Sequence, residues 1–115
     1  MSKPLSEQRC VPCEGGIPAL TATEAKTLLE QTPQWQLSDN HDAIHRVFDF
    51  KGFYATMSFI NMVAWIAQQQ GHHPDVQFGY NQCTITFTTH AINGLSDNDF
   101  ICASLIDNAI LEPSH

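Results

Sequence analysis

The fold of this chain is decided by residues 68–90, which read QQQGHHPDVQFGYNQCTITFTTH. Gly71 can adopt the left-handed conformation that closes a helix. Pro74 cannot continue a helix, and it forces His73 towards extended backbone. The stretch therefore predicts the end of a helix, a Gly-His-His-Pro corner, and then a β-hairpin whose last residue is His90.

The hairpin is predicted from side chains that alternate along two short runs on either side of an Asn-Gln turn. The alternating residues are Val76, Phe78 and Tyr80, then Cys83, Ile85, Phe87 and Thr89. A short hairpin brings its far end back towards its beginning. We therefore expect His90 to lie close to His72 and His73.

A long helix is predicted before the corner. Its apolar stripe has helical spacing at Phe53, Met57, Ile60, Ala64 and Ala67, and it is flanked by Phe59, Val63 and Ile66. A stripe this wide on a helix of about five turns is the best core element of the chain.

The first part of the chain predicts one helix and two strands. Thr21 is a helix N-cap with Glu24 as its capping-box partner, and the helix ends before Pro33. Residues 35–37 suggest a short strand and residues 43–50 a second one. Arg46 breaks the alternation of the second strand, which is therefore either an edge strand or one that carries its arginine outward.

A last helix is predicted after the Asn93-Gly94 turn. Ser96 caps it, and acidic residues occupy its first turn. We expect its apolar residues to pack on the sheet: Ile101, Leu105, Ala109 and Ile110.

The order of elements is α-β-β-α-β-β-α, which predicts an α+β fold. It would be a single domain with a four-stranded antiparallel sheet and helices packed on one face. Residues 1–20 are predicted to form a loosely ordered N-terminal arm, and residues 21–115 the domain.

Composition narrows the function. The net charge is −7 and there are only five Lys and Arg, which argues against direct binding of nucleic acid. The longest apolar run is too short to cross a bilayer, so no membrane association is expected. The N-terminus lacks the apolar segment of a signal peptide, which predicts a cytoplasmic protein. A small neutral substrate fits better than a phosphate-rich one, because there is no Gly-rich phosphate loop.

Four cysteines without a secretion signal do not indicate a disulfide framework. Cys83 and Cys102 lie in apolar segments and are interpreted as small core residues. Cys10 and Cys13 form a lone C-x-x-C, which could be half of a zinc site or a redox pair. A second pair with suitable spacing is missing from the sequence.

The three histidines of the stretch admit several interpretations. Imidazole titrates near neutrality and can donate or accept a proton at working pH. The histidines could equally be polar surface residues. They could also hold zinc, although His72 and His73 are adjacent and their side chains diverge, unlike an i, i+4 pair on a helix.

Several motifs together resemble the pterin-4a-carbinolamine dehydratase family. They are G-H-H-P-D at the corner, an aromatic at Tyr80, T-H at His90, and G-L-S-x-x-D from Gly94 to Asp99. The resemblance extends to F-D-F-K-G-F before the corner and to C-x-x-C-x-G-G-x-P in the arm. It covers nearly the whole chain, and the spacing of the histidines is specific.

The resemblance implies a hydro-lyase that converts 4a-hydroxytetrahydropterin to quinonoid dihydropterin and water. This reaction recycles the pterin used by aromatic amino-acid hydroxylases. The family needs neither a metal nor an organic cofactor, and its members are commonly homodimers or homotetramers. His72, His73 and His90 match the family's active-site histidines, and Asp99 matches the acidic residue that closes the motif.

The chemistry suits these residues. Dehydration needs one proton delivered to the leaving hydroxyl and another removed from a ring nitrogen. Our hypothesis is that His72 and His90 form the acid/base pair, while His73 positions the pterin. We assign substrate binding to His73 together with Pro74, Thr89, Asp99 and Gln68.

Two of these residues differ from a simple match. The family usually has an acidic residue four positions before the first histidine, where this chain has Gln68. Gln68 could accept a hydrogen bond from His72 but could not stabilise an imidazolium by charge. Asp99 also fits a helix start, because Ser96-x-x-Asp99 is close to a capping box.

Two other functions stay open. One is a non-catalytic interaction protein, because some relatives are dimerisation partners of a transcription factor. The other is a pterin-binding role associated with molybdopterin enzymes.

Overall fold

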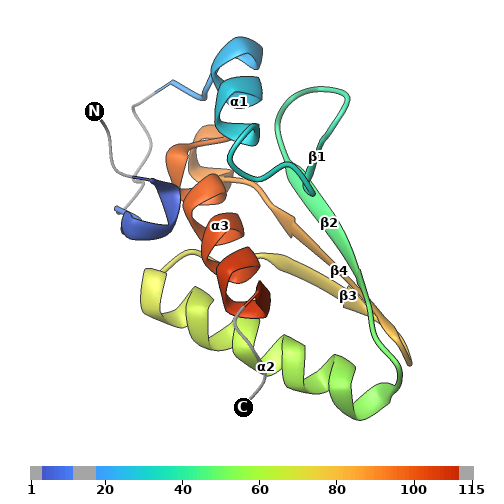
Figure 1. Cartoon of the computed structure of the whole chain (residues 1–115). Coiled ribbons are helices and arrows are strands. Elements are labelled where there is room, and N and C mark those ends of the chain that lie inside the picture. Colours follow the sequence, from blue (N-terminus) through green and yellow to red (C-terminus); the bar gives the residue numbers. More distant parts are fainter. Residues whose placement is uncertain (1–3, 12–17, 112–115) are drawn as a thin grey trace.

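The computed structural model describes residues 4–11 and 18–111. Its elements, in order, are η1 (Leu5–Glu7), α1 (Ala22–Leu29), β1 (Gln36–Leu37), β2 (Ile44–Asp49), α2 (Phe53–Gln70), β3 (Asp75–Phe78), β4 (Gln82–Phe87), η2 (His90–Ile92) and α3 (Asp97–Leu111). Helices α2 and α3 cover one face of the sheet (Figure 1). The predicted α+β class and the order of helices and strands are confirmed.

The sheet has four antiparallel strands in the order β1-β2-β4-β3. β4 pairs with β2 from Ile44↔Phe87 to Asp49↔Gln82, and with β3 on its other side. β2 is therefore an inner strand, so its interpretation as an edge strand is wrong. β3 ends at Phe78, and Tyr80 lies in the turn rather than on the strand.

Arg46 is turned inward, towards α3. Its Nη1 atom lies 2.7 Å from Oδ1 of Asp107, and its guanidinium lies 4.5 Å from the centroid of the Phe48 ring. The expectation that it points outward is wrong because Asp107 offers an opposite charge where the sheet meets the helix. Trp35 donates its indole N–H to the same carboxylate, at 2.9 Å.

Local backbone signals place the ends of the helices as the sequence predicts. Thr21 and Glu24 form both hydrogen bonds of a capping box at α1. Gly71 closes α2 with φ of 67°, and Asn93 takes a similar left-handed conformation with φ of 52° in the turn before α3. These conformations depend on a few neighbouring residues, which is why the sequence reveals them.

The buried face of α2 differs from the predicted stripe. The residues that are buried are Thr56, Phe59, Val63, Ile66 and Ala67. Phe53 is 50% exposed, and Ala64 is also exposed. The helix is apolar on several sides, so spacing could not tell which side packs. Contact of Phe59 with Phe48, at 4.5 Å between ring centroids, sets the rotation.

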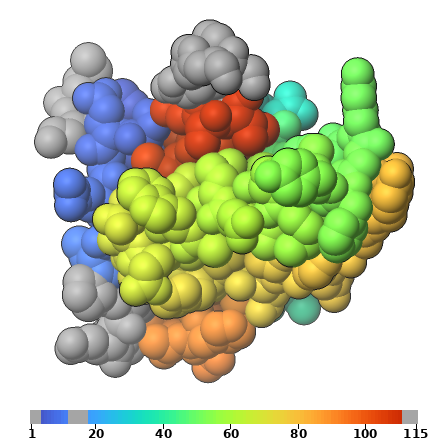
Figure 2. Space-filling view, turned by 90° about the horizontal axis from the view of Figure 1, so that it is seen from below, coloured from blue at the N-terminus to red at the C-terminus, as the bar shows by residue number. Residues whose placement is uncertain are grey.

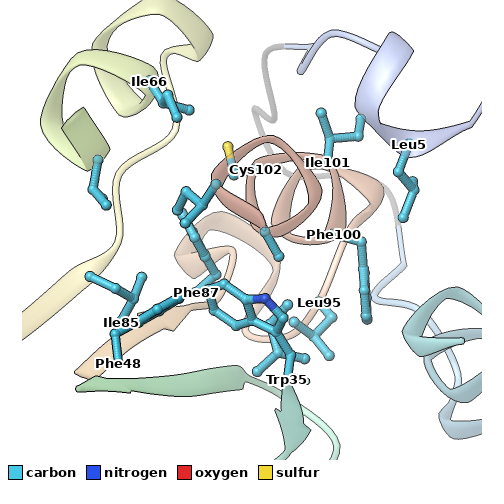
Figure 3. Packing of buried hydrophobic residues seen from close by; sticks show 14 of the residues in the cluster. Leu5, Trp35, Phe48, Ile66, Ile85, Phe87, Leu95, Phe100, Ile101 and Cys102 are labelled. Carbon is cyan, nitrogen blue, oxygen red and sulfur yellow. The ribbon is translucent and has the colours of Figure 1, made fainter. Parts of the chain in front are cut away.

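Helix α3 is the centre of the core. Figure 3 shows Phe100, Ile101 and Cys102 projecting from it in different directions, with Leu5 of η1 near Ile101. Leu5 is 1% exposed, so the segment 4–11 of the predicted arm packs on the core at this residue. Of the residues predicted to pack on the sheet, Ile101 is 2% exposed, whereas Ile110 is 38% exposed.

Within residues 4–11 and 18–111, no helix is both long enough and apolar enough to span a membrane.

The ion pair of Arg46 and Asp107 predicts a pH-dependent loss of stability in Arg46→Met. Burial raises the pKa of the Asp107 carboxyl, while the hydrogen bond from Trp35 and the charge of Arg46 lower it. Without Arg46 the pKa of Asp107 in the folded state rises further above its pKa in the unfolded state. The variant therefore loses no stability from this carboxyl below the unfolded-state pKa. The loss grows as the pH rises between the two pKa values and is complete above the folded-state pKa. We expect a loss of about 1–3 kcal/mol at about pH 8 that shrinks towards about pH 4.

Urea unfolding of wild type and variant at both pH values measures this loss. Lys26→Met, at an exposed position on α1, is the matched control. An equal loss of stability at the two pH values would contradict the prediction.

Candidate active site

The corner after α2 turns His72 into the molecule. The His72 N–H donates to the carbonyl of Ala67, at 3.2 Å, and Gly71 supplies the left-handed step between them. The imidazole stacks on the ring of Phe87 with 5.8 Å between centroids and 10° between planes. The His72 side chain is consequently only 12% exposed, at the junction of α2 and β4.

Asp99 holds the His72 ring. The Asp99 side chain is fully buried, and its Oδ1 lies 2.6 Å from Nε2 of His72. Its Oδ2 accepts the Thr89 hydroxyl at 2.7 Å and the Ser96 N–H at 3.0 Å. Because Thr89 donates to the carboxylate, the Ser96 hydroxyl, 2.8 Å away, donates to Thr89. These donors satisfy both oxygens of a buried carboxylate.

A pocket of about 250 Å³ lies beside this network. The residues around it include all three histidines of the corner and hairpin, His72, His73 and His90, together with Thr89. This agrees with the expectation that the histidines lie close together, while their chemical roles remain predictions. His73 and His90 are exposed, and His72 is largely covered.

His90 reaches the pocket in a way that the sequence did not predict. β4 ends at Phe87, Thr89 forms an isolated bridge with Gly94, and His90 begins the short helix η2. His90 is therefore not the last residue of the hairpin strand. The prediction missed the Thr89–Gly94 bridge, which ends the strand and turns the chain towards α3.

Asp99 combines the two interpretations that its sequence allowed. Its carboxylate caps the start of α3 by accepting the Ser96 N–H, and it also bonds His72. The hydrogen bond of His72 goes to Asp99 rather than to Gln68, which is exposed on α2. Gln68 and Pro74, both assigned to substrate binding, do not line the pocket.

Val11 and Asn98 are among the pocket-lining residues that were not predicted from the sequence. Val11 belongs to the arm and is 67% exposed, whereas Asn98 is 4% exposed in the first turn of α3. Neither residue type signals a site on its own. The only hint was the motif around Val11, C-x-x-C, whose second cysteine, Cys13, lies outside the described residues.

The described cysteines are thiols. Cys10 Sγ lies 3.5 Å from Cys102 Sγ, and this contact together with burial raises the pKa of the Cys102 thiol far above its usual range. Burial also raises the pKa of Cys83. Both are core residues of low reactivity. No group of three or more metal-binding side chains occurs within the described ranges.

Chemically, the arrangement suits proton transfer to a small bound molecule. Asp99 occupies Nε2 of His72 and fixes the ring, which leaves Nδ1 for exchange with a ligand. His90 and His73 provide further imidazoles around the same space.

The chain matches a known protein family over most of its length. The model of the family described as "Pterin 4 alpha carbinolamine dehydratase" matches residues 18–109. This chain belongs to that family.

Individual relatives agree. A protein of Nitrosomonas eutropha, provisionally named pterin-4-alpha-carbinolamine dehydratase, is 54% identical over 93% of this chain and 94% of its own length. One from Legionella pneumophila with the same provisional name is 46% identical over 97% of this chain and all of its own. The crystal structure of a "transcriptional coactivator/pterin dehydratase" from Brucella melitensis is 32% identical, with a TM-score of 0.74 over 78% of this chain and 96% of that one.

Asp99→Asn should change the tautomer of His72. An ionised carboxylate only accepts hydrogen bonds, so His72 carries its proton on Nε2. In the variant the amide oxygen is needed by the Ser96 N–H, and the amide N–H₂ then faces His72. We expect the proton to move to Nδ1, which nitrogen-15 NMR of the imidazole detects.

Other histidines in the same spectrum serve as internal references, and Asp97→Asn, at an exposed position in the same turn, is the matched variant. An unchanged His72 tautomer in Asp99→Asn would show that the carboxylate does not fix the ring.

Proposed function

We propose that this protein dehydrates 4a-hydroxytetrahydropterin to quinonoid dihydropterin and water, with His72 and His90 as the acid/base pair. The observation that carries the proposal is that His72 and His90 come from distant segments and line one pocket, with a buried carboxylate holding His72. Membership of the pterin carbinolamine dehydratase family supplies the reaction.

The proton balance of the reaction suits two histidines. One protonated imidazole delivers a proton to the 4a-hydroxyl, and the C4a–O bond breaks to release water. A neutral imidazole removes the proton of the adjacent ring nitrogen, whose electron pair forms the new double bond to C4a. No redox change occurs, and the two histidines return to their starting states by exchanging protons with solvent.

The size and lining of the pocket fit a small bicyclic substrate. Its volume of about 250 Å³ lies just below the range of about 300–1,000 Å³ common for ligand sites. His73 and Thr89 add polar groups that could position the pterin. We propose that this reaction helps to recycle, in the cytoplasm, the pterin that aromatic amino-acid hydroxylases use.

His72→Ala and His90→Ala should each lower kcat by about 10²- to 10⁴-fold, because each removes one proton-transfer group. The rate of 4a-carbinolamine dehydration above the uncatalysed background measures this, with circular dichroism to confirm folding. His45→Ala, a partly buried histidine on β2, is the control. Full turnover in either variant would overturn the acid/base assignment.

We further propose that the protein is a homodimer or homotetramer. The supporting observation is the outer face of α2, where Tyr54 is 86% exposed and Trp65 is 65% exposed. The two residues lie about three turns apart and share one side of the helix. In Figure 2 this helix, green to yellow, runs across the middle of the face. Exposed aromatic side chains of this kind mark interaction surfaces.

Trp65→Glu should lower the mass measured by light scattering, because it places a charge in the proposed contact. Thr23→Glu adds the same charge on α1 and should leave the mass unchanged. A monomeric wild type would contradict the proposal.

The second candidate function is that of an interaction protein. The exposed face of α2 favours it, and the Brucella melitensis relative carries the word coactivator in its name. Direct binding of nucleic acid is disfavoured by a net charge of −7. Absence of dehydratase activity in folded wild type would favour this second function.

A further inference from the structure

We infer that the arm, residues 4–11, forms one side of the pterin site: Val11 packs on the bound pterin, and Asn98 is the positioning residue that holds it there. This inference rests on the proposed function. It adds a residue that lies outside residues 18–109, the part matched by the family.

The side-chain amide of Asn98 bonds both the N–H and the carbonyl of Val11. The Val11 N–H donates to Oδ1 of Asn98 at 3.0 Å, and Nδ2 of Asn98 donates to the Val11 carbonyl at 2.7 Å. Asn98 is 4% exposed, so its amide is held in place by the surrounding core. A paired amide contact of this kind sets both the position and the direction of the backbone at Val11.

The residue before Val11 is held as well. The Cys10 N–H donates to Oε1 of Gln70, on the last turn of α2, at 2.8 Å. Its thiol lies 3.6 Å from the Asn98 carbonyl and 3.5 Å from the Cys102 sulfur. In Figure 2 the arm (blue) lies beside the yellow end of α2, which leads into the histidine corner. The arm therefore bridges the last turn of α2, just before His72, and the first turn of α3, which carries Asp99.

These contacts leave the Val11 side chain free to meet a ligand. It is 67% exposed although its backbone is fixed, and it lines the same pocket as a largely polar set of residues. A pterin is a flat bicyclic ring system with polar edges and apolar faces. Val11 supplies an apolar surface for such a face, while the histidines and Thr89 meet the polar edge.

Val11→Ala and Asn98→Ala test the inference. Steady-state dehydration gives KM and kcat, and titration with a stable dihydropterin gives Kd. Loss of an apolar contact should raise KM and Kd by about tenfold in Val11→Ala, with kcat changed by less than about twofold. Asn98→Ala should raise the same two constants, because it releases Val11.

The double variant separates positioning from direct contact. If Asn98 acts through Val11, adding Asn98→Ala to Val11→Ala should raise Kd little further, whereas independent effects would multiply. Gln31→Ala is the control, because Gln31 accepts the Leu5 N–H at 3.1 Å and so holds the other end of the arm. It should leave KM and Kd unchanged.

The outcomes distinguish the two proposals. A wild type that neither binds the dihydropterin nor dehydrates the substrate would overturn the proposed function and this inference together. A wild type that does both, with KM and Kd unchanged in Val11→Ala, would overturn the inference alone. If the increases in Kd of the two single variants multiply in the double variant, Asn98 does not act by positioning Val11.

Discussion

The site depends on one requirement: the buried carboxylate of Asp99 must receive hydrogen bonds. An unpaired carboxylate away from water is very costly, so its donors are not optional. They come from the corner after α2 (His72), the bridge after β4 (Thr89) and the start of α3 (Ser96). Satisfying one side chain therefore brings three distant segments together, and the histidine pocket forms where they meet.

The first turn of α3 serves both folding and function. Asp99 caps the helix and holds His72, while its neighbour Asn98 holds the arm. A helix start is well suited to this, because its backbone N–H groups need acceptors and a carboxylate there is favoured by the helix dipole. Structural and functional roles are thus combined in the same residues, and a capping interpretation of Asp99 does not compete with a site interpretation.

Much of the fold was predictable because its signals are local. The capping box at Thr21, the left-handed Gly71 and the alternation along β4 each involve a few consecutive residues. The buried side of α2 was not predictable in the same way. Apolar residues surround that helix, and only contact with Phe48 and its neighbours selects the side of Phe59.

The helices and strands, the histidine corner and the family resemblance could be predicted from the sequence, because these depend on residue types and short spacings. The hydrogen-bond and ion-pair partners of individual side chains could not be predicted and depend on the tertiary structure. In the folded protein His72 bonds Asp99 rather than Gln68, and Arg46 points inward and pairs with Asp107. Val11 of the arm lines the pocket. The physical reason is that such contacts join residues far apart in the chain, and their geometry is set only when the helices dock on the sheet.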